Sequence, residues 1–422
     1  MSQNMVRYEL DPSVLAVWRQ ANETYLTRDV FNGLPLPSRL SRDGVWRLIQ
    51  SLRRASGMEM PFEPLLDHEG ENVSWINLPV DLRLALHRIA AHSSSGTELN
   101  RFLESRTPRM RLSFMLDEIA AACMRDGLAI DRGRVRDVIQ GRIRPATPEE
   151  KTVDAFCSIA EEVGRGAVST ISVEFIEDVF SLLSRYGAVD DAARAAVRYS
   201  FLMSPHRPES LESVVRLSSE AMLLRYGSPV ICWIGITTVM WDYQPLPRFN
   251  ALVELVLRHV YLRQHRMAPL AYVDFLAQSL AWETGKPTRA DNVLPFTQVV
   301  VDESGEGFDA TPYFAGALPI IEAGLSHLTE QATRAAAVEG DMRALIEAED
   351  SLNMRQRDFL CGLVGDVERP VTVESYRRRF NVAHSTAVAD LRVLRERGLL
   401  KMSYDGKRQV HRLSVPGVMS LR

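Results

Sequence analysis

The sequence predicts a mainly α-helical protein with a helical core, a small β segment and an α+β domain at its C-terminal end. Its 422 residues are 46% hydrophobic and 25% charged, which is the composition of a globular protein. Apolar residues recur at helical spacing through the middle of the chain, as at Val214, Leu217, Ala221 and Leu224. Polarity alternates over residues 197–204, which predicts a strand.

The chain is too long for one ordinary core, so two or three domains are expected. An N-terminal region is expected at 1–104, and Ser, Ser, Ser and Gly at 93–96 form a flexible break near its end. A helical body follows at 105–285. Residues 286–350 are expected to form a loop without helical period and then a long connecting helix over 312–348.

The last segment, 351–422, has the features of a small DNA-binding domain. Thr372 is placed to cap a helix, and a tight turn at Asp405-Gly406 predicts a two-stranded hairpin. The segment contains 14 Lys and Arg against 7 Asp and Glu, a net charge of +7 that leaves −11 for the rest of the chain. A basic domain on an acidic body is typical of a DNA-binding appendage.

Several classes of protein are not favoured by this sequence. No run approaches the roughly 18 apolar residues that a membrane span requires, and the N-terminus does not resemble a secretion signal. A cytoplasmic protein without a membrane partner is therefore expected. Cysteines stand at Cys123, Cys157, Cys232 and Cys361, without metal-ligand spacing, and are expected to be reduced and buried. Neither a metal nor a cofactor is expected.

The most informative segment is 241–252, which reads WDYQPLPRFNAL. It resembles the active-site loop of Fic-domain proteins, whose signature is H-P-F-x-(D/E)-G-N-G-R-x-x-R. Pro245 and Asn250 match this signature, and Leu246 replaces its aromatic residue. The other positions differ: Gln244 replaces the catalytic histidine, Arg248 the metal-binding carboxylate, Phe249 and Ala251 the two glycines, and Leu252 and Leu255 the two arginines.

These replacements remove the groups that the family reaction needs. The resemblance implies transfer of AMP from ATP to a protein hydroxyl, which requires a general base, and Gln244 has no titratable proton. Arg248 would repel magnesium, and Leu252 offers no donor to a phosphate. Glycines let backbone N–H groups close around phosphate oxygens in conformations that a phenylalanine avoids. The sequence therefore predicts an inactive site, with no catalytic residue and no metal.

The segments around the loop resemble the same family in the same order. These are 116–121 (the family's inhibitory helix, with alanine in place of its glutamate), 134–139 and 172–180 (earlier helices), 197–204 (the flap over the target peptide), 228–236 (the helix before the loop), 252–264 (the helix after it) and 308–314 (a "DLTxF" segment). His259 and His265 flank the helix after the loop, and both are expected to be structural or surface residues.

The C-terminal segment resembles the winged-helix domain appended to many Fic proteins. Residues 352–357 match its "LNxRQ" start, and 382–394 resemble its recognition helix, "VSxxTAxRDLxxL". Ala383 replaces the usual capping serine and Ala389 the usual arginine. The DNA-binding candidates are His384, Ser385, Thr386 and Arg392 on the recognition helix, Arg377 and Arg378 on the second helix, and Lys407 and Arg408 at the wing tip.

Three functions remain open from the sequence. The first is a degenerate, catalytically inactive Fic-like protein that regulates transcription as a homodimeric, winged-helix DNA-binding protein. The second is a protein-interaction, antitoxin-like or defence-system component that binds a protein partner and no DNA. The third is a Fic-type nucleotidyltransferase with atypical residues, among them Asn250, Arg248 or His259.

Overall fold

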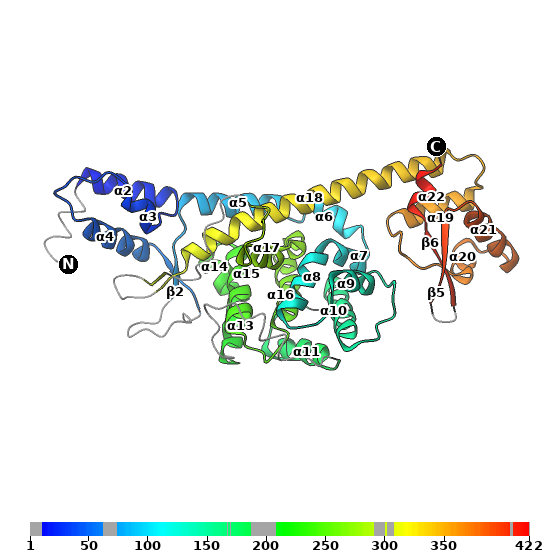
Figure 1. The fold of residues 1–422 in the computed structure, drawn as a ribbon, viewed down its shortest axis with the longest axis horizontal. Coiled ribbons are helices and arrows are strands. Elements are labelled where there is room, and N and C mark those ends of the chain that lie inside the picture. Colours follow the sequence, from blue (N-terminus) through cyan, green and yellow to red (C-terminus); the bar gives the residue numbers. More distant parts are fainter. Residues whose placement is uncertain are drawn as a thin grey trace.

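The computed structural model describes residues 11–61, 74–166, 168, 170–186, 208–290, 300–301, 308–405 and 408–421. Helices dominate these residues, as the sequence predicts, and the strands form two small sheets. Three apolar cores define an N-terminal unit, a central body and a C-terminal module. The first and last lie at opposite ends of the body, and one long helix runs along it to the module (Figure 1). The predicted flap at 197–204 lies outside the described residues.

The N-terminal unit contains helices α2 (Pro12–Glu23), α3 (Arg28–Asn32) and α4 (Arg42–Ala55). Each helix begins at a residue whose side chain accepts a hydrogen bond from the first turn, namely Asp11, Thr27 and Ser41. Phe31 on α3 packs against Trp46 on α4, with ring centroids 5.1 Å apart, and the buried residues of α2 belong to the same apolar core. Local capping therefore sets where these helices start, and the aromatic pair holds them together.

The body is built around two helices that are buried on all sides, α15 and α16. Its elements are α5 (Val80–Ser93), α6 (Glu98–Glu104), α7 (Pro108–Arg111), η1 (Leu112–Met115), α8 (Leu116–Arg125), α9 (Arg132–Ile139), α10 (Pro148–Gly164), α11 (Val173–Ser184), η2 (Pro208–Ser210), α13 (Leu211–Leu217), α14 (Glu220–Tyr226), α15 (Pro229–Thr238), η3 (Val239–Tyr243), α16 (Asn250–Gln264), η4 (Ala268–Tyr272) and α17 (Phe275–Glu283). Helices α8, α10 and α15 pack against α16. Every residue of α16 from Asn250 to Leu262 is buried, so α16 occupies the centre of the body.

A four-stranded sheet joins the N-terminal region to the segment before the long helix. Its strands are β1 (Met58–Glu59), β2 (Ser74–Ile76), β4 (Phe308–Asp309) and β3 (Val300–Val301), in that order. The segment 286–311, predicted as a loop without helical period, contains two of these short strands, β3 and β4. All of β2 is buried, so its backbone groups need partners, and β4 supplies them in a parallel pairing of Trp75 with Asp309.

The long connecting helix is confirmed as α18 (Thr311–Ala348). It starts where the Asp309 carboxylate accepts the Thr311 backbone N–H at 2.9 Å. The first part of α18 packs into the core of the body, whereas Met342 and Ile346, in its last turns, belong to the core of the C-terminal module. One continuous helix thus connects the two cores.

The C-terminal module consists of α19 (Met354–Val364), α20 (Val373–Phe380), α21 (His384–Glu396), β5 (Leu400–Asp405), β6 (Arg408–Leu413) and α22 (Val415–Met419). Thr372 caps α20 as predicted, in a reciprocal box with Ser375. Ala387, Leu391 and Leu394 form the buried face of α21. The predicted hairpin is also confirmed, because β5 and β6 pair antiparallel in the described residues on both sides of the turn.

No single helix among the described residues is long and apolar enough to cross a membrane. Helix α14 together with α15 and η3 meets the length and composition criterion only as a pair bent by 113°.

Of the four cysteines, three are buried as expected, whereas Cys361 is half-buried, and all four are free thiols. Burial raises the pKa of the Cys157 thiol to about 12 and that of Cys232 to about 11, so both stay protonated near neutral pH.

Candidate functional site

The loop at 244–249, which the sequence analysis compared with the Fic signature, connects the π-helical turn η3 to α16. Gln244, the first residue after η3, has a left-handed backbone with φ of 46°. Asn250 closes the loop from the other side: its Oδ1 accepts the Leu246 N–H at 3.0 Å, and its Nδ2 donates to the Leu246 carbonyl at 2.7 Å. Asn250 is buried and both ends of its amide are engaged. Its role in this chain is therefore to hold the loop.

Phe249 corrects the expectation that a phenylalanine avoids the backbone of the glycine it replaces. It adopts a left-handed conformation, with φ of 59° and ψ of 25°, at the start of α16. This conformation costs a side chain about 1–2 kcal/mol. Burial of the ring, which is 0% exposed, contributes about 1.5–3 kcal/mol and offsets the strain. The chain thus keeps the turn while filling the space around it.

Asp126 occupies the N-terminus of α16. Its Oδ1 accepts the Ala251 N–H at 3.0 Å and its Oδ2 accepts the Leu252 N–H at 2.9 Å, and Asp126 itself is 6% exposed. Helix N-termini bind anions because their N–H groups are free and the helix dipole is positive there. An internal carboxylate therefore takes the position where the resemblance places phosphate.

The same end of α8 holds the beginning of the loop. Arg125 donates to the Trp241 carbonyl at 3.0 Å and lies 3.6 Å from the Asp242 carboxylate. Arg248, which replaces the metal-binding carboxylate, donates to the Ser184 carbonyl at 3.3 Å and stacks against the Phe249 ring at 5.1 Å. These contacts fix the Arg248 guanidinium at the position where the signature has its metal-binding carboxylate.

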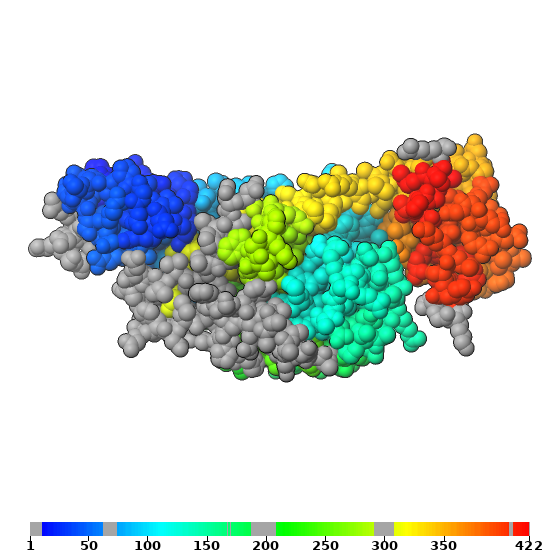
Figure 2. All heavy atoms as spheres, viewed as in Figure 1, coloured from blue at the N-terminus to red at the C-terminus, as the bar shows by residue number. Residues whose placement is uncertain are grey.

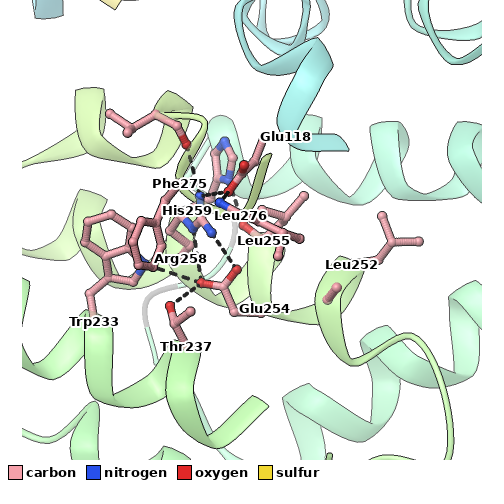
Figure 3. A network of polar contacts seen from close by, with 12 residues as sticks. Glu118, Trp233, Thr237, Leu252, Glu254, Leu255, Arg258, His259, Phe275 and Leu276 are labelled. Atoms are coloured by element: carbon pink, nitrogen blue, oxygen red, sulfur yellow. Dashed lines mark hydrogen bonds and ion pairs between the residues drawn. The ribbon is translucent and has the colours of Figure 1, made fainter. Parts of the chain in front are cut away.

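A charged network lies deeper in the body, between α8 and α16 (Figure 3). The Arg258 guanidinium donates to Glu118 at 2.6 Å and to Glu254 at 2.8 Å, and all three side chains are 0% exposed. Glu118 also accepts the backbone N–H groups of Leu276 and Ala277, each at 2.9 Å, and so caps α17. Burial raises the pKa of Glu118 despite the neighbouring guanidinium.

Two hydroxyl and indole donors complete this network. The Thr237 hydroxyl donates to the Glu254 carboxylate at 2.8 Å, and the Trp233 indole N–H donates to the same carboxylate at 3.3 Å. Both donors lie on α15. The network therefore joins α8, α15, α16 and α17, and Glu118 points to Arg258 rather than to the loop. The sequence comparison with an inhibitory helix at 116–121 did not find this role, because nothing local to Glu118 indicates a partner 140 residues away.

His259 and His265 do not replace the missing catalytic histidine. His259 is buried, and its Nδ1 donates to the Leu255 carbonyl at 2.7 Å. Desolvation lowers the pKa of His259 to about 4, so the ring is neutral at pH 7. His259 lies nine positions after Asn250 on α16, roughly 13 Å along the helix. The structural role expected for His259 is confirmed, and desolvation also lowers the pKa of His265.

The DNA-binding candidates on α21 lie on one side of the module. His384, Ser385 and Arg392 are exposed and Thr386 is half-buried. Helix α21 forms the outer end of the module, away from the body (Figure 1). Its N-cap, Ala383, makes no side-chain cap, as predicted. This arrangement leaves the predicted recognition face accessible.

The other candidates are placed less uniformly. Arg377 and Arg378 are exposed on α20, and both pair with Glu374 at 2.9 Å. Such exposed pairs contribute little to stability and separate readily when a stronger anion is present. Arg408 is exposed at the start of β6, whereas Lys407 lies outside the described residues.

Asp390 organises the C-terminal module, and the sequence analysis missed it. This buried carboxylate on α21 accepts hydrogen bonds from Tyr376 at 3.0 Å, Gln356 at 3.1 Å, Asn353 at 3.2 Å and Arg355 at 3.2 Å. The residues that match the "LNxRQ" and "DL" patterns are thus bonded to each other. Their joint presence in the sequence was the signal that could have identified this contact.

Comparisons with known proteins add no family assignment. No protein-family model matches the chain, and a search of curated proteins finds no significant match. Among the described residues, no group of three or more His, Cys, Asp or Glu side chains is arranged to hold a metal ion. The class that the geometry defines is a mainly helical protein with a self-capped loop and a basic C-terminal module.

Proposed function

We propose that this protein is a DNA-binding regulator in which a winged helix is attached to a Fic-like body without transferase activity. The observation that carries the proposal is the exposed face of α21, with His384, Ser385 and Arg392, on a module whose net charge is +7. A helix of this kind enters the major groove, where such side chains contact base edges. The hairpin of β5 and β6 would form the wing.

The loop supports the inactive part of the proposal. Gln244 offers no general base, and the Asp126 carboxylate fills the N-terminus of α16 that a phosphate would need. A nucleotide would have to displace a buried, doubly hydrogen-bonded anion before its phosphates reached these N–H groups. Mass spectrometry that detects AMP, UMP or phosphate on the protein or on lysate targets would contradict this.

Binding of the purified protein to its own upstream DNA, compared with a scrambled duplex over a series of salt concentrations, tests the regulator. Arg392→Ala is expected to weaken binding by about 1–3 kcal/mol and to reduce the preference for the native sequence, if this side chain reads a base. Arg47→Ala, which removes the same charge from the exposed face of α4 in the N-terminal unit, serves as the matched control. Equal affinity for both duplexes, unaffected by Arg392→Ala, would argue against the regulator.

A protein-interaction role is the second candidate. The module exposes Val388 on α21 and Tyr404 on β5, at 42% and 67%. Exposed apolar and aromatic side chains on one small module favour a protein partner or a second copy of the chain. Stoichiometric co-purification of one protein, without DNA affinity, would support this candidate over the first.

A further inference from the structure

The body carries a basic segment where it meets the C-terminal module. Residues 131–145, from the start of α9 into the loop before α10, contain five arginines and two aspartates. The five arginines are exposed; they are Arg132, Arg134, Arg136, Arg142 and Arg144. The chain outside the C-terminal 72 residues has a net charge of −11, so this segment opposes the sign of its surroundings.

Direct contacts place this segment against the base of the hairpin. Arg142 pairs with Glu368, in the loop between α19 and α20, at 2.5 Å. Arg412 on β6 donates to the Glu368 carbonyl at 3.0 Å and to the Gly141 carbonyl at 3.4 Å. Figure 2 shows the turquoise part of the body in contact with the orange module. The basic segment is therefore continuous with the module's surface.

Some of these arginines are engaged within the protein and others are not. Arg132 pairs with Asp117, Arg134 with Glu150, and Arg142 with Glu368. Arg136 lies 3.6 Å from its sequence neighbour Asp137, a weak exposed contact. Arg144 makes no ion pair with any residue that the structure describes. Arg136 and Arg144 are thus the two side chains of the segment most available to an external anion.

The distance to the hairpin tip suits a DNA duplex. Arg412 and Arg408 are four residues apart on β6, roughly 13 Å at the usual rise of a strand. Duplex DNA advances about 3.4 Å per base pair, so this distance corresponds to about four base pairs. A duplex that ran along β6 from the hairpin tip would therefore reach the body within about four base pairs. A surface of net charge −11 would repel it unless basic side chains faced it there.

We propose that Arg136 and Arg144, together with the exposed Arg369 of the module, form a second phosphate-binding surface for duplex DNA. This junction surface rests on the proposed function, and it extends the bound duplex from the module onto the body. The contacts are to phosphates and carry no sequence preference. The pair between Arg142 and Glu368 holds the two parts of the junction surface in line.

The test measures binding of the full chain to a fluorescein-labelled, 40-base-pair random-sequence duplex between 50 and 200 mM KCl. Each lost phosphate contact reduces the slope of log K against log salt by about 0.9. The double variant Arg136→Ala/Arg144→Ala is therefore expected to have a slope shallower by about 2 and weaker binding at 50 mM. Arg19→Ala/Arg47→Ala, on α2 and α4 at the opposite end of the molecule, removes the same charge and is expected to bind like the wild type.

Three results would overturn the junction surface. If both double variants bind with the wild-type slope while Arg377→Ala/Arg378→Ala weakens binding, the module alone contacts DNA, and the proposed function stands without the junction surface. If the wild-type chain binds neither this duplex nor its own upstream DNA, both proposals are wrong. An equal loss of affinity in Arg136→Ala/Arg144→Ala and in Arg19→Ala/Arg47→Ala would show a bulk charge effect and would also contradict a local contact.

Discussion

The Asp126 carboxylate accepts a hydrogen bond from the Ala251 backbone N–H at 3.0 Å, and this contact fixes the N-terminus of α16. Ala251 stands where the family signature has its second glycine. Asp126 is the residue directly after α8, 125 positions earlier in the chain. A helix terminus suited to binding a phosphate is therefore occupied by the protein's own anion.

Removal of this carboxylate is expected to destabilise the body. Asp126→Ala leaves two buried N–H groups of α16 without an acceptor, which is expected to lower the free energy of unfolding by about 2–4 kcal/mol. Asp126→Asn keeps one acceptor and is expected to cost less. Urea unfolding followed by circular dichroism measures both. Asp131→Ala, which removes an exposed helix cap on α9, is a control with an expected loss of about 1 kcal/mol.

The buried network predicts a strong dependence on Arg258. Arg258→Met leaves the Glu118 and Glu254 carboxylates buried without their cation, and a loss of about 3–5 kcal/mol is expected. Adding Glu118→Gln and Glu254→Gln to Arg258→Met is expected to recover part of that loss. Equal stability of the single and triple variants in chemical denaturation would contradict the assigned charge pairing.

Glu118 predicts a stability change at acidic pH. Its pKa is raised above the ordinary value of 4.5, mainly by burial, so the folded state binds this proton more tightly than the unfolded state. Its contribution to the free energy of unfolding therefore rises as pH falls from the folded-state pKa toward 4.5. The difference between wild type and Glu118→Gln, measured at each pH by urea unfolding, is expected to rise over that window. A difference that stays level with pH would refute the assignment.

His259 is expected to give the opposite dependence of the free energy of unfolding on pH. Desolvation lowers its pKa from 6.5 to about 4. The contribution of neutral His259 to the free energy of unfolding is therefore fully present above pH 6.5 and is lost as pH falls toward 4. The shift corresponds to about 3 kcal/mol at most. His259→Gln is expected to show no such loss between these pH values. His384→Gln is the matched control, because His384 is exposed on α21.

Asp390 predicts the stability of the C-terminal module. Asp390→Ala removes the shared acceptor of Tyr376, Gln356, Asn353 and Arg355, and a loss of about 3 kcal/mol or more is expected. The module is expected to unfold before the body, which would appear as a separate first transition in thermal unfolding. Arg392→Ala, two residues away and exposed, should leave that transition unchanged.

Much of the fold follows from local sequence. The caps at Thr27, Ser41 and Thr372, the buried face of α21 and the long helix α18 each depend on residues within a few positions of one another. The pairing of β2 with β4 does not, because it joins residues more than 230 positions apart. No periodicity in a three-residue strand indicates such a partner.

The candidate sites divide in the same way. The sequence by itself determined which groups the loop lacks, because a glutamine cannot act as a base in any fold, and it determined where the basic charge lies. Only the tertiary structure decided that Asp126 caps α16, that Glu118 pairs with Arg258, and that the arginines of 131–145 meet the C-terminal module. The physical reason is that such contacts gain their energy from burial and proximity between distant segments, which local sequence patterns do not encode.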